Sequence, residues 1–155
     1  MKVSEGARDI LATEALALAD QLPPGERRAE FQELAWAAEQ GEIPQDLEDR
    51  AGELLGLTLE TGRVRSVHGP GGVQALVGVW RETPQGRALT HAVEELNQAL
   101  SALRGSLIES LRVAPTAPGA YSITIAAGDA EVRLTIDRAG ARLSGINVGV
   151  GGVGE

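Results

Sequence analysis

The 155-residue sequence contains no cysteine, a single lysine and few aromatic side chains. The missing thiols exclude disulfides, thiolate catalysis and sulfur-ligated metals. Lys2 lies near a terminus, so a Schiff-base or phosphate-binding lysine has no well-placed candidate. Aromatic residues make up 3% of the chain and hydrophobic residues 43%. Any buried core must therefore consist mainly of Leu, Val, Ile and Ala.

Long apolar runs are also missing. No stretch approaches the roughly 18 apolar residues of a membrane span, and the first residues lack the basic flank and apolar run of a secretion signal. We therefore expect no membrane association and a cytoplasmic location. The net charge is −8, with most of the acidic excess in residues 1–68. Because this sign repels a phosphate backbone, general nucleic-acid binding is disfavoured.

The first half of the chain has helical periodicity. Apolar spacing and turn residues predict helices over 4–22 and 26–40, a third helix from Pro44, and a fourth after Gly72, where a strand is the alternative because of Val77, Val79 and Gly78. The segment 57–67 is compatible with either a helix or a strand, and the spacing of its apolar residues favours a helix. The sequence thus predicts an N-terminal bundle of three to four helices over residues 1–82.

The strongest periodicity follows Thr83-Pro84, which are favourable residues for starting a helix. Leucine and valine then recur at spacings of three and four as far as Leu111, which predicts one long amphipathic helix over 84–112. Gly105 is a weak point where this helix could bend.

After Pro118-Gly119 the hydrophobic period changes to two. Three strands are predicted, over 121–126, 131–137 and 142–150, with a bulge at Ser144-Gly145 that keeps the apolar residues on one face. We therefore expect an α+β protein in which residues 83–150 form the long helix and a three-stranded antiparallel meander. A Gly-rich tail follows at 151–155, and the two regions could share one core.

The predicted long helix raises a problem of lengths. Twenty-nine residues span about 43 Å as a helix, whereas a seven-residue strand spans roughly 23 Å. Part of the leucine stripe must therefore be covered by the N-terminal helices or by another copy of the chain, and the sequence leaves both alternatives open. The candidate interface residues are Leu89, Val93, Leu96, Leu100, Leu103 and Leu107.

A second candidate is the glycine-rich stretch that leads to the first residues of the predicted fourth helix. A helix N-terminus can bind an anion through its free amides. The residues of this possible ligand or anion site are His68, Gly71, Gly72 and Trp80. The stretch lacks the Gly-Lys-Ser/Thr of a phosphate loop, so a plain connector is the favoured interpretation.

Other motifs are too incomplete to assign chemistry. Gly149, Gly151 and Gly154 match a dinucleotide fingerprint, but no helix or ribose-binding acid follows them. His91 and Glu95 stand four residues apart, which is too few ligands for a metal site. We predict no catalytic residues, no cofactor and no resident metal.

These observations favour a non-catalytic assembly, adaptor or regulatory protein. It would act through protein–protein contacts, with another copy of the chain as one expected partner. The alternative hypothesis is a small-ligand-binding module or small enzyme with a pocket near His68 and Trp80.

Overall fold

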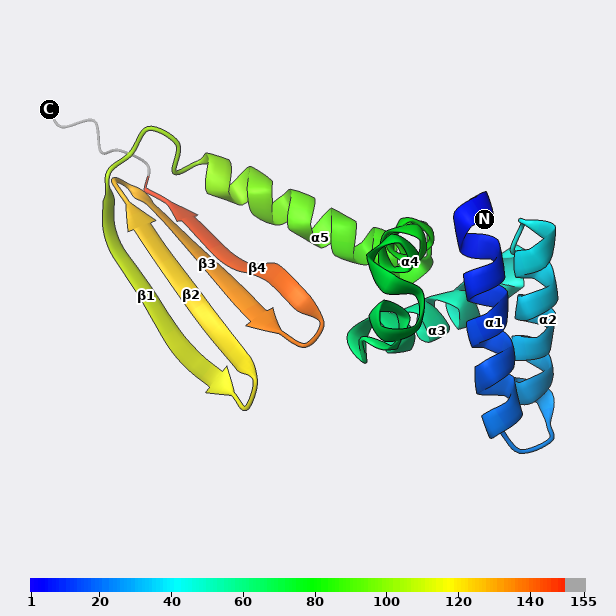
Figure 1. Ribbon diagram of the computed structural model, residues 1–155. Helices are drawn as coiled ribbons and strands as arrows, with labels where there is room; N and C mark the ends of the chain where they lie inside the picture. Colours follow the sequence, from blue (N-terminus) through cyan, green and yellow to red (C-terminus); the bar gives the residue numbers. More distant parts are fainter. Residues whose placement is uncertain (150–155) are drawn as a thin grey trace, which may run out of the picture. The chain divides into compact units, whose positions relative to one another are not determined.

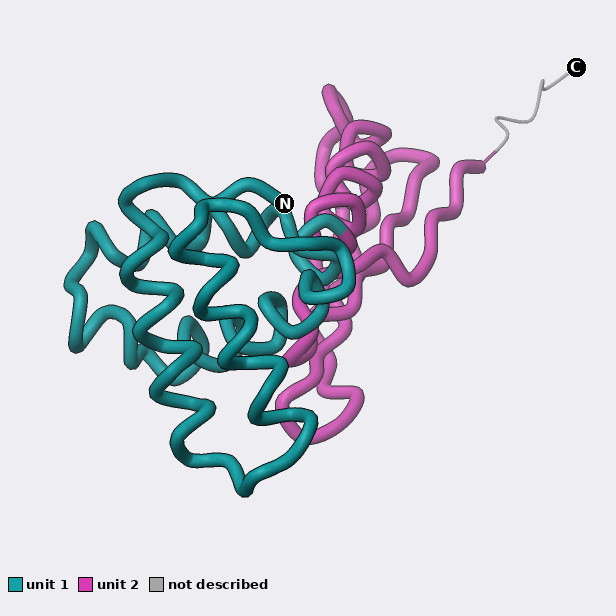
Figure 2. Tube along the Cα trace, turned by 90° about the vertical axis from the view of Figure 1, so that its right-hand side faces the viewer, with its two compact units in different colours: residues 1–87 teal, residues 88–155 magenta. Residues whose placement is uncertain are grey.

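The computed structural model describes residues 1–149, and it divides the chain into two compact units, Met1–Arg87 and Ala88–Glu155 (Figure 2). The fold is α+β, with five α-helices followed by a four-stranded antiparallel sheet (Figure 1). The division between the units lies inside the fifth helix, five residues after the boundary expected from the sequence. The predicted tail at 151–155 lies outside the described residues.

Unit 1 is helical. It contains α1 (Glu5–Gln21), α2 (Glu26–Gln40), a short 3-10 turn η1 (Gln45–Leu47), α3 (Glu48–Glu60) and α4 (Arg63–Arg81). The turn around Pro23-Pro24-Gly25 joins α1 and α2, which pack against each other. The predicted bundle is confirmed with four helices, and the ambiguous segment 57–67 is helical on both sides of a break at Gly62.

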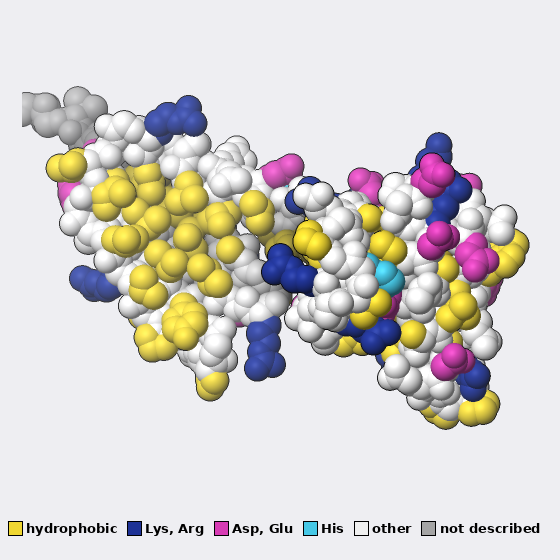
Figure 3. All heavy atoms as spheres, viewed as in Figure 1, with side chains coloured by type: hydrophobic (Ala, Val, Ile, Leu, Met, Phe, Trp, Pro, Cys, Tyr) yellow, Lys and Arg dark blue, Asp and Glu magenta, His cyan; other side chains and the backbone are white. Residues whose placement is uncertain are grey.

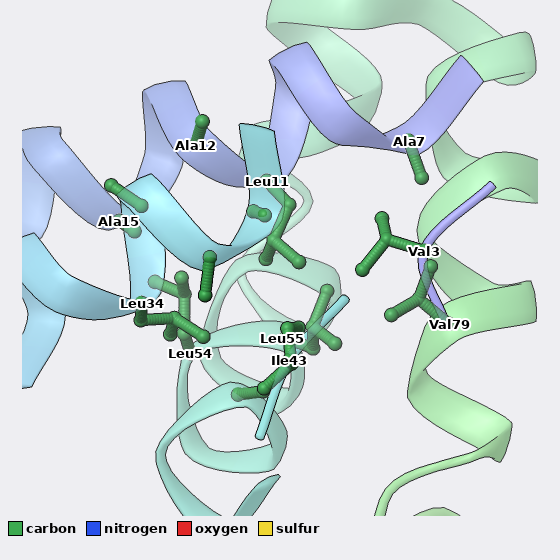
Figure 4. Packing of buried hydrophobic residues seen from close by; sticks show 14 of the residues in the cluster. Val3, Ala7, Leu11, Ala12, Ala15, Leu34, Ile43, Leu54, Leu55 and Val79 are labelled. Carbon is green, nitrogen blue, oxygen red and sulfur yellow. The ribbon is translucent and has the colours of Figure 1, made fainter. Parts of the chain in front are cut away.

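The core of unit 1 is built from its helices and the segments that connect them. Phe31, Leu34, Leu54 and Leu55 are buried to 1% exposure or less. Val3, Ala7, Leu11, Ile43 and Val79 bring side chains from the N-terminal segment, α1, the α2–η1 connection and α4 into the same cluster (Figure 4). The buried core of this unit is thus formed by its own segments, and its exposed large apolar side chains lie one on each helix: Leu16, Trp36, Leu57 and Val67.

The α4 helix contains a break at the glycine-rich stretch. Gly69 has φ 69° and ψ −173°, which only glycine adopts readily, and Pro70 begins the next helical segment. The prediction of a turn before a further helix is therefore confirmed, although helix precedes the turn as well as following it.

Unit 2 consists of most of α5 (Pro84–Ser101) and the sheet, whose strands are β1 (Ile108–Ala117), β2 (Ala120–Ala127), β3 (Ala130–Asp137) and β4 (Gly140–Val148). The strand order is β1-β2-β3-β4, so the sheet is a simple meander. The predicted start of α5 is confirmed, because the Thr83 hydroxyl accepts a hydrogen bond from the Gly86 amide at 3.2 Å. The predicted bulge also occurs, where the β3–β4 register shifts between Arg133 and Leu134, opposite Ser144.

Two details of the prediction for this region are wrong. The helix ends at Ser101 rather than near residue 112, and the sheet has four strands rather than three. Gly105, at φ 81°, lies in the turn that follows the helix. The residues after it form β1 in place of two further helical turns. Leu103 therefore lies in a turn, Leu107 precedes the strand, and Leu111 belongs to the sheet.

Candidate interaction surface

The register of the strands places the apolar residues of the sheet on one face. In each antiparallel pair the directly opposed residues share a face, and Val113 opposes Ile123, Ile123 opposes Leu134, and Leu134 opposes Leu143. We call this side the apolar sheet face. Its members are Ile108, Leu111, Val113, Pro115, Tyr121, Ile123, Ile125, Val132, Leu134, Ile136, Ala141, Leu143, Ile146 and Val148.

Helix α5 covers only the middle of this face. Leu96 and Ala99 are buried against Val132 and Leu134 on β3. Side chains around them are partly buried in the same cluster: Leu100, Leu103, Ile123, Ala141 and Leu143. At the other end of α5, Leu89 lies so close to Gly140 that a Cβ there would be 2.6 Å from its Cδ1. The helix thus follows β3 and its neighbours as far as the β3–β4 turn and leaves β1 uncovered.

All ten residues of β1 are exposed. Leu111 is 64% exposed, Val113 61% and Ile108 58%, and Tyr121 beside them on β2 is 48% exposed. Figure 3 shows hydrophobic side chains gathered over the strands of unit 2. We call the uncovered part of the apolar sheet face next to β1 the open patch; it consists of Ile108, Leu111, Val113, Pro115, Tyr121 and Ile136.

The opposite face of the sheet is polar. Arg133 pairs with Glu131 at 3.3 Å, and Arg142 pairs with Asp137. Thr124 and Arg133 oppose each other across β2 and β3 on this side. The contrast shows that the open patch is not part of a generally apolar surface, because neighbouring positions along each strand alternate between apolar and polar side chains.

The six residues expected to form a leucine interface are distributed over three environments. Leu96 is buried against the sheet, and Leu89, Leu100 and Leu103 are half-buried. Val93 is 38% exposed and Leu107, between the α5 turn and β1, is 84% exposed. Sequence reasoning missed the open patch itself, although the alternation of Leu111, Val113 and Pro115 is a strand signal.

The second candidate region centres on a buried carboxylate. Glu14 of α1 is 2% exposed, and its two carboxylate oxygens contact an arginine and a histidine of α4. The Arg63 Nε donates to Oε2 at 2.6 Å, and the His68 Nε2 lies 3.2 Å from Oε1. His68 thus faces α1 within the helical unit, and the pair of contacts fixes the first half of α4 to α1.

The structure brings together only part of the predicted anion site. A Cβ on Gly72 would lie 2.5 Å from the His68 Cβ, so these two residues are in close contact. Gly71 is exposed, and Trp80 lies near the end of the helical segment that follows the break at Gly69, twelve residues after His68. Trp80 is half-buried against the core of unit 1, and its carbonyl accepts a hydrogen bond from the Thr83 hydroxyl at 2.6 Å.

A hollow of about 240 Å³ lies beside Glu14 in unit 1. Its walls come from α1, from α3, from Thr61 and from the first residue of α4, and they are mostly apolar. The lining residues are Glu14, Ala17, Leu18, Gln21, Leu54, Leu57, Thr58, Thr61 and Arg63. Neither His68 nor Trp80 is among them, so the hollow is not the predicted His68–Trp80 pocket, although Glu14 in its wall contacts His68.

Ionisable groups elsewhere in unit 1 form structural pairs. Burial works to raise the pKa of Glu48, but hydrogen bonds from the Met1 amine and from Arg87, together with their positive charges, hold it below its usual range. Hydrogen bonds to Glu30 and Glu53 raise the pKa of Arg50. Both effects favour the charged forms, as expected for ion pairs that stabilise the fold.

Within residues 1–149, no group of three or more His, Cys, Asp or Glu side chains is arranged to hold a metal ion. The His91–Glu95 pair is present at 3.4 Å, but both side chains are more than half exposed. In the same part of the chain no helix combines the length and apolar character needed to cross a bilayer. Gly151 and Gly154 of the dinucleotide fingerprint lie outside the described residues.

Comparison with known proteins identifies no relative. A scan against protein-family models, a search of curated proteins and a search of solved structures all give no match. The functional argument for this chain therefore depends on its own geometry.

Proposed function

We propose that this chain is a non-catalytic assembly or adaptor protein that acts through protein–protein contacts and associates with itself, with the cytoplasm as its compartment. The observation that carries the proposal is the open patch, where the apolar face of the sheet extends beyond the part that α5 covers. Fully burying one Leu, Ile or Val side chain stabilises a structure by about 1.5–3 kcal/mol. Leaving several of them exposed side by side forgoes a large stabilisation that a protein partner would recover.

The size of the patch supports the same proposal. Single exposed apolar side chains are normal on protein surfaces, but contiguous patches beyond a few hundred Å² mark interaction sites. From the exposed fractions of its members, the open patch presents an area on the order of 600 Å². It is bordered by α5 on one side and by the free edge of β1 on the other, and this form suits a protein surface better than a small ligand.

A substitution on β1 tests this proposal. Leu111→Glu places a charge in the open patch, and Arg112→Gln alters the next residue, which opposes Thr124 on the polar face. The measurement is the mass of the particle that contains the chain, by light scattering after purification and by size fractionation of the source extract. We expect wild type and Arg112→Gln in particles heavier than 16.2 kDa and Leu111→Glu as a folded single chain. Free wild-type chain in both settings would refute the proposal.

The hollow beside Glu14 favours a second candidate function, the binding of a small, largely apolar ligand by unit 1. Its walls combine apolar side chains with a buried carboxylate and an arginine, which is a common composition for a ligand site. The test is a thermal-shift screen of small metabolites with wild type and with Ala17→Phe, which would fill the hollow. A shift in wild type that disappears in Ala17→Phe supports this function, and the absence of any shift argues against it.

A further inference from the structure

The composition of the open patch indicates the kind of partner that it fits. The inference drawn from it rests on the function proposed above. Its six members carry no charged side chain. Among residues 108–127, which form β1, β2 and their turn, Glu109 and Arg112 are the only acidic and basic residues, one of each sign, and Arg112 belongs to the polar face. The surface therefore offers no charge complement to a strongly acidic or basic partner.

The distribution of charge along the chain separates the two units. Residues 1–87 contain fifteen acidic and nine basic side chains, a net charge of −6, whereas residues 88–155 contain seven acidic side chains and five arginines, a net charge of −2. Two copies of the sheet unit can thus approach each other with little repulsion, while unit 1 keeps the strong charge. A nearly neutral surface with an apolar centre is best matched by another surface of the same kind.

The area of the patch is sufficient for a dimer. Complete burial of the patch in two copies would remove at most about 1,200 Å² from water, which lies at the lower end of the standard size for specific interfaces. The same area is too small for the obligate interfaces above 2,000 Å². We therefore expect a dimer that dissociates on dilution.

The height of α5 limits how the two copies can meet. Sheets that pack face to face lie about 10 Å apart, and a helix with its side chains is about 10–12 Å across. A second sheet can therefore cover β1 and β2 but cannot pass over α5, which forms the border of the contact. In a two-fold arrangement each α5 would border the partner's β1, and the contact would be closed, so that dimers form rather than fibres.

We infer that the open patch binds the same patch of a second copy of this chain, face to face, in a closed two-fold dimer. The apolar side chains of β1 and β2 are then buried between two sheets, and the polar faces remain in water. This arrangement explains why β1, whose residues are all exposed in the single chain, nevertheless alternates apolar and polar side chains like a half-buried strand.

The absence of native cysteine provides a direct test. Val113→Cys introduces one thiol into the open patch, and Ala114→Cys introduces one at the next residue, on the polar face. The rate of labelling by a maleimide is measured at about 1 µM and about 100 µM protein, a range chosen to bracket a micromolar dissociation constant. We expect the Val113→Cys thiol to label roughly fivefold more slowly at the higher concentration, since dimers then predominate, and the Ala114→Cys thiol to label at one rate throughout.

The mass of the wild-type particle, measured in parallel by light scattering, distinguishes the possible failures. A dimer in which Val113→Cys stays as reactive as Ala114→Cys has formed elsewhere, for example by pairing of β1 edges; it overturns this inference and leaves the proposed function standing. A wild-type chain that stays single at every concentration also overturns the inference. The proposed function then falls as well only if the extract contains wild type as free chain.

Discussion

The two units of this protein bury their apolar side chains to different degrees. Unit 1 surrounds its apolar side chains with four helices, so that Leu34 and Leu54 have at most 1% of their surface exposed. Unit 2 places one helix on a four-stranded sheet and leaves Leu111 and Val113 more than 60% exposed. Because both units draw on the same residue types, the difference lies in how much of each apolar surface the chain itself can cover.

The comparison shows that unit 2 is the part of the chain where a contiguous apolar surface stays uncovered. A four-stranded sheet has an apolar face wider than one helix, and α5 has only 18 residues. Closing the face would take a second helix, a second sheet or another protein. In unit 1 the exposed large apolar side chains are Leu16, Trp36, Leu57 and Val67, one on each helix, whereas those of the open patch adjoin one another on the paired strands β1, β2 and β3.

The largest expected effect is a difference in the free energy of unfolding between two leucine-to-alanine variants, one in each unit. Leu54→Ala removes a side chain from the closed core of unit 1 and should lower the free energy of unfolding by about 2–5 kcal/mol. Leu111→Ala, measured on dilute single chains, should cost less than about 1 kcal/mol because the side chain is already mostly in water. Urea unfolding followed by circular dichroism checks both values, and equal losses would contradict the contrast between the two units.

A smaller loss of stability is expected for a substitution near the end of unit 1, at Gly86. A Cβ at Gly86 would lie 2.0 Å from the Trp80 carbonyl oxygen and 2.7 Å from the Arg81 Cα. Because these are backbone atoms, Gly86→Ala should destabilise unit 1 by about 1–3 kcal/mol.

The control for this change is Gly56→Ala in α3, where a Cβ would meet no atom within 4 Å. It should stabilise the helix by about 0.5–1 kcal/mol. The sign of the two changes, measured by thermal unfolding, should be opposite; a neutral Gly86→Ala would show that the α4–α5 connection is looser than described.

The pH dependence of stability should come in part from Glu48 in unit 1. Its folded-state pKa is lowered, chiefly by the Met1 amine and Arg87 acting against burial, so its ionised form stabilises the fold above the ordinary carboxyl pKa. That contribution is lost as the pH falls from about 5 through the lowered pKa. We expect Glu48→Gln to have a flatter acid limb than wild type in urea titrations from neutral pH downward. The control is Asp46→Asn at a nearby exposed position, and an identical slope in all three proteins would contradict the assignment.

The smallest effect on stability is expected for a substitution of an exposed residue of α5, in unit 2. His91 and Glu95 form an exposed pair at 3.4 Å, and such pairs contribute little to stability. Glu95→Gln should change the free energy of unfolding by less than about 0.5 kcal/mol. It should also leave the mass of the particle unchanged. A shift to single chains would show that the interface lies on α5 and not on the open patch.

The sequence predicted much of this fold because local patterns agreed with it. The Thr83-Pro84 start, the helical first half and the bulge at Ser144 are all encoded within a few residues. The strand β1 was missed because Leu103, Leu107 and Leu111 continue the four-residue spacing of α5 beyond Gly105. These residues fit both a helical and a strand periodicity, and in the structure β1 pairs with the adjacent strand β2.

The candidate sites were less predictable for a physical reason. Glu14 contacts Arg63 and His68, which lie about fifty residues later in the sequence, and no local sequence pattern predicts such a contact. The apolar sheet face follows from alternation, but its exposure depends on where α5 ends and which strands it crosses. The leucine stripe was therefore identified correctly as apolar, while the uncovered surface lies on the sheet instead.

Sedimentation equilibrium of the purified wild-type chain, from about 1 µM to about 100 µM, tests the central claim that the open patch is covered by a second copy. The account predicts that the average mass rises with concentration from 16.2 kDa towards twice that value, and that Val113→Glu, but not Ala114→Glu, abolishes the rise. A mass of 16.2 kDa at every concentration, or a rise that Val113→Glu leaves intact, would contradict it.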